Sequence, residues 1–71
     1  MKKADAEKGI RYAASKWYRA AGRPEHPSFY AFKQWMREQG HDSYLEFRST
    51  TGADYDAERW FDDEMRGERR P

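Results

Sequence analysis

The chain has 71 residues, of which 14 are basic and 13 acidic, with a formal net charge of +1 and no cysteine. This length suits one small domain, and the lack of cysteine excludes disulfides and thiolate metal sites. No stretch approaches the roughly 20 apolar residues of a membrane helix. We therefore expect a single domain over residues 1–71, without a membrane partner and located in the cytoplasm.

The apolar residues are mainly aromatic. The chain has three tryptophans, five tyrosines and four phenylalanines, whereas Ile10 and Leu45 are its only branched aliphatic residues. A shortage of aliphatic residues is typical of disorder only when net charge is high and aromatics are few. Here the net charge is only +1, and the aromatic residues recur at helical spacing. We therefore predict an all-α fold, a small bundle of three main helices plus a short fourth, with an aromatic-rich core. Its predicted centre consists of Trp17, Phe29, Phe32, Trp35, Met36, Leu45, Phe47, Trp60 and Phe61.

The first helix is predicted over residues 4–21, where apolar residues recur at helical spacing. This face consists of Ala6, Ile10, Ala13, Ala14, Trp17 and Ala21. Gly22 and Pro24 then end the helix. Gly9 costs about 1 kcal/mol relative to alanine, so we expect the first turns to fray.

The second helix is predicted over residues 28–39, after a loop that contains two prolines. It is expected to end at Gly40. Its apolar arc is wide enough for burial against two neighbours, which predicts that this helix is the central one. The arc consists of Phe29, Ala31, Phe32, Trp35 and Met36.

Residues 43–49 are ambiguous between helix and strand. Ser43 and Glu46 fit a capping box, which favours a helix, whereas the run from Tyr44 onward has strand propensity. An unpaired strand would leave its backbone groups without partners, so we predict a short helix. The last helix is predicted over residues 54–66, with Gly67 as its stop and 67–71 as a loose tail. Its inner face consists of Ala57, Trp60, Phe61 and Met65.

Charge is distributed unevenly along the chain. Residues 1–23 hold seven basic and two acidic residues, and residues 49–71 hold four basic and seven acidic residues. The outer face of the first helix is a candidate for binding nucleic acid or an acidic partner, because cations beside a tyrosine suit phosphates and bases. The candidate residues are Lys8, Arg11, Tyr12, Lys16, Arg19 and Arg23. Alternatively, this face is solvated and partly paired with the acidic last helix, where Glu64 either pairs with it or extends to solvent.

A protein interface is the other candidate site, because tyrosine and arginine are common anchors of interfaces. The candidate residues are Tyr12, Tyr18, Tyr30 and Tyr55, which lie on predicted outer faces or flanks. We expect a non-enzymatic interaction or regulatory protein that binds a protein partner, or itself, through exposed tyrosines and arginines. The alternative is a nucleic-acid-binding protein that uses the basic face of the first helix.

Other chemistry has weaker support. Asp54, Asp56 and Glu58 resemble the opening of a calcium loop, but its sixth and twelfth places hold Arg59 and Met65 instead of Gly and Glu. His26 and His41 are expected at the surface, and the sequence has no Gly-x-Ser-x-Gly elbow or phosphate-cradling glycine loop. A helix-turn-helix would need residues 43–49 as a recognition helix, with few base-reading side chains. We expect no catalytic residue, metal, cofactor or small-molecule substrate.

The segment WMREQGHDSY, residues 35–44, resembles the Trp-Leu-x-x-x-Gly-x-x-x-Tyr start of sterile alpha motif domains, which are helical protein-interaction modules. The later Ile-Asp-Gly pattern of that family is absent, so no residue roles are transferred from it.

Overall fold

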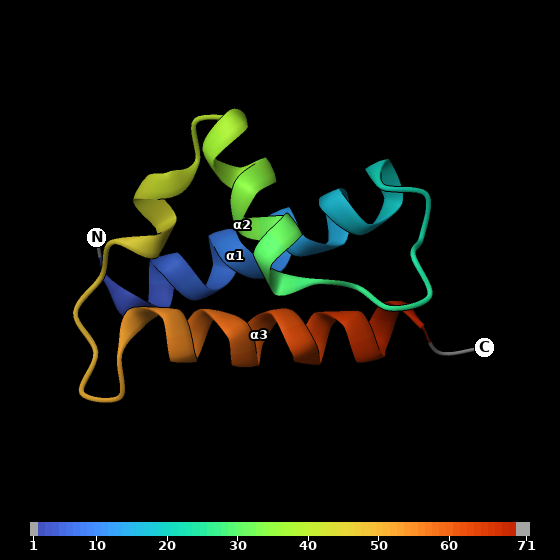
Figure 1. The fold of residues 1–71 in the computed structure, drawn as a ribbon. Coiled ribbons are helices and arrows are strands. Elements are labelled where there is room, and N and C mark those ends of the chain that lie inside the picture. The colour runs from blue at the N-terminus through green and yellow to red at the C-terminus, as the bar shows by residue number, and fades with distance from the viewer. Residues whose placement is uncertain (1, 70–71) are drawn as a thin grey trace.

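The computed structural model describes residues 2–69 and is all-helical, as predicted (Figure 1). Its elements are α1 (Lys3–Ala20), α2 (Phe29–Glu38), the 3-10 turn η1 (Asp42–Leu45) and α3 (Ala53–Glu68). No residue of this range lies in a strand. Within the same range, none of the helices is both long and apolar enough to cross a membrane.

Helices α1 and α3 lie side by side and run in the same direction, and α2 rises away from this pair (Figure 1). Two ion pairs agree with this parallel arrangement: Lys3 pairs with Asp56 near the N-terminal ends of the two helices, and Arg19 pairs with Glu68 near their C-terminal ends. Helix α1 packs against α2, η1 and α3, and most extensively against α3. The prediction that the second helix is central is therefore wrong, because α1 takes that place.

The core is aromatic, as the composition predicts. The Phe32 ring is fully buried and lies 5.0 Å from the Phe61 ring and 5.9 Å from the Trp17 ring, measured between centroids. Ala6 and Ala14 are also fully buried on α1. Their small side chains allow neighbouring elements to approach α1 closely.

Some predicted core positions are corrected by the structure. Phe29, Trp35 and Leu45 were expected at the centre, but they are only partly buried and pack against its edge. Ala21, expected on the inner face of the first helix, is exposed because α1 ends at Ala20 and the chain turns away there.

Two of the three predicted glycine stops are confirmed. Gly22 and Gly40 follow the ends of α1 and α2 and have φ values of 81° and 76°, a conformation that favours glycine. After Gly40, the N–H of His41 donates to the carbonyl of Met36 at 2.8 Å, which closes a Schellman-type cap. Both stops thus satisfy carbonyls of the final turn.

The third predicted stop is wrong. Helix α3 continues through Gly67 to Glu68, so residues 67–68 are helical rather than part of a loose tail. Gly67 does not have a positive φ, and an added side chain would meet nothing within 4 Å. Arg69 is the C-cap of this helix, and the last two residues of the predicted tail, 70–71, lie outside the described residues.

The short fourth helix is confirmed only in part. A single 3-10 turn covers Asp42–Leu45, and residues 46–49 continue without helical or strand structure. Phe47 is buried there, with its ring stacked 5.3 Å from the Trp60 ring. Burial of Phe47 therefore explains why the chain leaves the helical path. A helix-turn-helix has no recognition helix in this segment.

Candidate interaction face on helix α1

One flank of α1 is paired with the acidic helix α3. Arg11 lies at the centre of this contact: its Nη1 is 3.3 Å from Glu64 Oε1, its Nη2 is 3.5 Å from Asp63 Oδ2, and its Nε is 2.9 Å from Glu7 Oε2. The open question about Glu64 is thus answered, because it pairs with α1. Partial burial of Arg11 opposes its charge, but the hydrogen bonds that Arg11 donates to Glu7, Glu64 and Asp63 outweigh this effect and raise the pKa of Arg11.

The pairing extends toward the C-terminal ends of both helices. Glu68 accepts a hydrogen bond from the Ser15 hydroxyl, and its Oε1 lies 3.5 Å from Arg19 Nη2. Arg19 itself is largely exposed, so this second ion pair is screened by solvent and contributes little. Arg11 and Arg19, both predicted for the binding face, are therefore engaged within the fold to different degrees.

At the opposite end, Asp56 joins three segments. Its carboxylate is buried and accepts hydrogen bonds from the hydroxyls of Ser49 and Thr51, the latter at 2.7 Å. Lys3 Nζ of α1 lies 3.3 Å away. The hydrogen bonds from Ser49 and Thr51, with a smaller contribution from Lys3, lower the pKa of Asp56. Asp56, which the sequence analysis weighed as part of a calcium loop, thus has a structural role.

The outer side of α1 remains exposed. Lys8, Tyr12 and Lys16 follow one another at intervals of four residues, which places them along one side of a helix, and Tyr12 is 72% exposed. No carboxylate within residues 2–69 forms an ion pair with Lys8, Lys16 or the exposed Arg23. We call Lys8, Tyr12 and Lys16 the α1 face.

A small hollow of about 100 Å³ adjoins the α1 face. We call it the α1–α2 pocket, because α1 and α2 form two of its sides and the segment after Gly40 forms the third. Its lining consists of Gly9, Tyr12, Ala13, Lys16, Trp35, His41 and Tyr44. The rings of His41 and Tyr44 lie 5.8 Å apart at its edge.

Sequence reasoning missed this pocket, because it assigned Trp35 to the centre of the core and expected the turns around Gly9 to fray. Gly9 is helical, and a Cβ added there would lie 2.5 Å from Tyr44 Cε1. Glycine therefore allows the tyrosine ring to lie directly against α1. The detectable signal was the pair of small residues Gly9 and Ala13, one turn apart on a side of the helix that also carries Lys16.

The predicted tyrosine interface divides into separate places. Tyr18 is only 6% exposed and belongs to the core, so its expected position on an accessible flank is wrong. Tyr30 and Tyr55 are 71% and 55% exposed and border one broad hollow between α2 and α3. Lys33 spans this hollow with its Nζ 3.1 Å from Asp54 Oδ2. Tyr12 is not among its lining residues.

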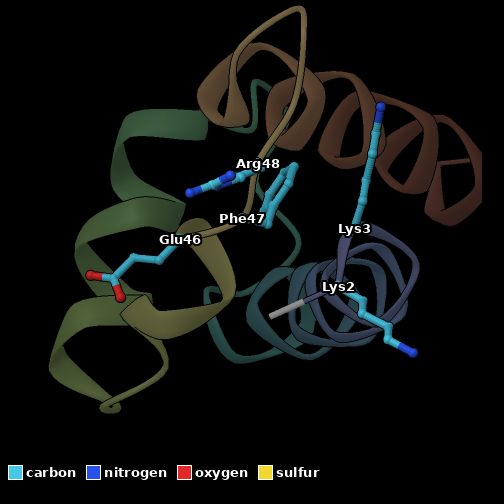
Figure 2. Close-up of a pocket in the computed structure, with 5 residues that line it drawn as sticks. All are labelled: Lys2, Lys3, Glu46, Phe47 and Arg48. Carbon is cyan, nitrogen blue, oxygen red and sulfur yellow. The ribbon is translucent and has the colours of Figure 1, made fainter.

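A broad hollow of about 620 Å³ near the start of α1 contains three cations but is not a focused anion site. Figure 2 shows that the side chains of Arg48 and Lys2 extend in different directions. Lys3 extends toward α3, where it pairs with Asp56. These charges therefore do not converge on one ligand position.

No group of three or more His, Asp and Glu side chains within residues 2–69 is arranged to hold a metal ion. His26 and His41 are both exposed, as expected. Comparisons with protein-family models, with curated proteins and with solved structures find no match to this chain.

Proposed function

We propose that this chain is a small non-enzymatic interaction protein that binds an acidic segment of a protein partner across the α1 face. The observation that supports this proposal is the one-sided pairing of α1: α3 covers the flank that contains Arg11, whereas Lys8 and Lys16 extend on either side of an exposed tyrosine. The cytoplasmic location stays a prediction from the absence of cysteine.

The distance between the two lysines of the α1 face defines the spacing of carboxylates expected in the partner segment. Lys8 and Lys16 are eight residues apart, which corresponds to about 12 Å along a helix axis. An extended chain covers that distance in about four residues. A segment with carboxylates four residues apart can therefore reach both lysines while it crosses Tyr12.

A protein partner is favoured over nucleic acid by the charges beside the α1 face. Arg11 is paired with three carboxylates, and Glu68 of α3 pairs with Arg19 further along α1. Those carboxylates repel a long phosphate backbone at more points than a short acidic segment that contacts only the α1 face. The sequence pI of about 8.0 is also below the value above 9 that is usual for nucleic-acid-binding domains.

The proposal is tested by NMR titration of the isotope-labelled protein with a matched pair of peptides. One peptide contains three repeats of Glu-Ser-Ala-Ser, which places a carboxylate at every fourth residue, and the other replaces each Glu by Gln. We expect the Glu peptide to shift the amide signals of Lys8, Tyr12 and Lys16 at low salt, and the Gln peptide to leave them unchanged. The absence of any shift with the Glu peptide at low salt would overturn the proposal.

Charge-reversal variants locate the binding surface. The double substitution of Lys8→Glu and Lys16→Glu should abolish the response to the Glu peptide. The matched control is the double substitution of Arg59→Glu and Arg66→Glu, because both are exposed arginines of α3 without an ion pair among the described residues. A labelled DNA duplex is titrated in parallel at two salt concentrations. Tight, steeply salt-dependent duplex binding that is lost in the double variant would replace the protein-partner proposal with the nucleic-acid alternative.

A further inference from the structure

We infer that the α1–α2 pocket is an anchor site for one branched aliphatic side chain of the acidic segment that binds the α1 face. This inference rests on the proposed function and adds the specificity that a charged face alone lacks. Tyr12 and Lys16 belong to both surfaces, so a segment crossing Tyr12 passes the opening of the pocket.

The lining of the pocket matches an apolar occupant. Tyr12, Trp35 and Tyr44 contribute aromatic rings, and Gly9 lets the Tyr44 ring lie against α1 near the small side chain of Ala13. Trp35 and Tyr44 are only partly buried, so apolar ring surface remains available for contact. Removing that surface from water favours binding of an apolar side chain.

The size of the pocket limits its occupant. An apolar cavity of about 150 Å³ holds a benzene molecule, whereas this pocket measures about 100 Å³. A four-carbon side chain such as that of leucine or isoleucine fits this space, and an indole does not. One aliphatic anchor is therefore expected instead of a run of large residues.

The charge of the pocket lining indicates which residues flank the anchor in the bound segment. Lys16 carries a positive charge in the lining, His41 adds two ring nitrogens, and none of the lining residues is acidic. Rings that enclose a cation usually favour quaternary ammonium groups, but Lys16 repels such a ligand. The occupant is instead an aliphatic residue with carboxylates nearby, and this matches the chemistry proposed for the α1 face.

The anchor site depends on Gly9. Any side chain at this position would approach the Tyr44 ring, with the added Cβ at 2.6 Å from Cδ1 and 3.0 Å from Cζ. The tyrosine ring would then have to swing away from α1. A single methyl group at Gly9 should therefore change the shape of the pocket without altering the lysines of the α1 face.

The test adds a third peptide, three repeats of Glu-Ser-Leu-Ser (the Leu peptide), which differs from the Glu-Ser-Ala-Ser peptide (the Ala peptide) only at the third residue of each repeat. We expect the Leu peptide to bind about tenfold more tightly than the Ala peptide, since its additional carbons are partly buried. Only the Leu peptide should shift the Trp35 indole N–H signal, which is assigned by its loss in Trp35→Phe.

The outcomes distinguish the two ideas. Equal affinity of the Leu and Ala peptides, with an unchanged Trp35 indole signal, would overturn the anchor site while the proposed function stands. Failure of the Ala peptide to shift the signals of the α1 face at low salt would overturn the proposed function, and the anchor site with it.

Two variants examine the pocket directly. Gly9→Ala should remove the tenfold preference for the Leu peptide but keep the response to the Ala peptide, and circular dichroism checks that it is folded. Gly67→Ala is the matched control, because an added Cβ there meets nothing within 4 Å. Tyr12→Ala provides a second variant, since this exposed residue can lose its ring without disturbing the core. An undiminished preference in both pocket variants would overturn the inference.

Discussion

The substitution Gly9→Ala has two opposing effects on the free energy of unfolding: a gain in helix propensity and a steric clash with Tyr44. Alanine in a helix interior is about 1 kcal/mol more favourable than glycine. The new Cβ would lie 2.5 Å from Tyr44 Cε1, so the ring must retreat by roughly 1 Å to reach ordinary van der Waals contact. Tyr44 is half-buried, and loss of part of its packing costs about 1–2 kcal/mol. The two effects nearly cancel in the single variant.

A double-mutant cycle separates these effects. When Tyr44→Ala has already removed the ring, Gly9→Ala should stabilise the protein by the full helical gain of about 1 kcal/mol. The coupling between the two positions should then be about 1–2 kcal/mol, which is in the range measured for residues in contact. Urea unfolding followed by far-UV circular dichroism gives all four free energies of unfolding.

The control for this cycle is Gly67→Ala, which lies in α3 with open space around it. It should stabilise the protein by up to about 1 kcal/mol, with the same value whether or not the Tyr44 ring is present. The reasoning is refuted if Gly9→Ala stabilises both backgrounds equally, because Tyr44 would then place no constraint on α1.

Three further predictions concern stability. Phe32→Ala should cost about 3–5 kcal/mol in urea unfolding, because it leaves a cavity in the core, whereas the partly buried Phe29→Ala should cost clearly less. Tyr18→Ala should destabilise by more than about 2 kcal/mol, and Tyr30→Ala should stay within about 0.5 kcal/mol, since only the first is buried; equal effects would contradict the position of Tyr18. The pKa of Asp56 is lowered in the folded state, so its contribution is present above its unfolded pKa of about 3.9 and is lost as pH falls below that value. Asp56→Asn should therefore be less stable than the parent at pH 7, with a gap that narrows on acidification to pH 2; a constant gap would contradict the lowered pKa.

Most of the fold follows from local patterns in the sequence. Apolar spacing identifies all three helices, and two glycines mark where α1 and α2 end. Gly67 fails as a stop because a glycine ends a helix only where the chain must adopt a positive φ, and the chain does not do so there. The pattern indicates where a helix can end, whereas tertiary packing decides whether it does.

The segment after η1 illustrates a second limit. The capping residues Ser43 and Glu46 favour a helix, but Phe47 is buried against Trp60 of α3, and a continuous helix would not direct it there. This competition between local propensity and a distant partner is not visible in the segment itself. Residue spacing alone therefore overestimates the length of this helix.

The candidate site was predicted less completely than the fold. The basic stripe and the exposure of Tyr12 follow from helical periodicity alone. The engagement of Arg11 by α3 does not, because it requires the relative placement of two helices far apart in the sequence. The α1–α2 pocket also depends on three separate segments, so only the pair of small residues at Gly9 and Ala13 indicated it.

The parallel pairing of α1 and α3 has a consequence for folding kinetics. The contacts that stabilise both helices join residues near 3–20 to residues near 53–68, so a long loop of chain must be closed when they form. Such non-local closure slows folding relative to bundles whose sequential helices pair through short hairpins. During synthesis, α1 therefore remains without its main packing partner until residues 53–68 have left the ribosome, and its conversion into a stable helix is a late event.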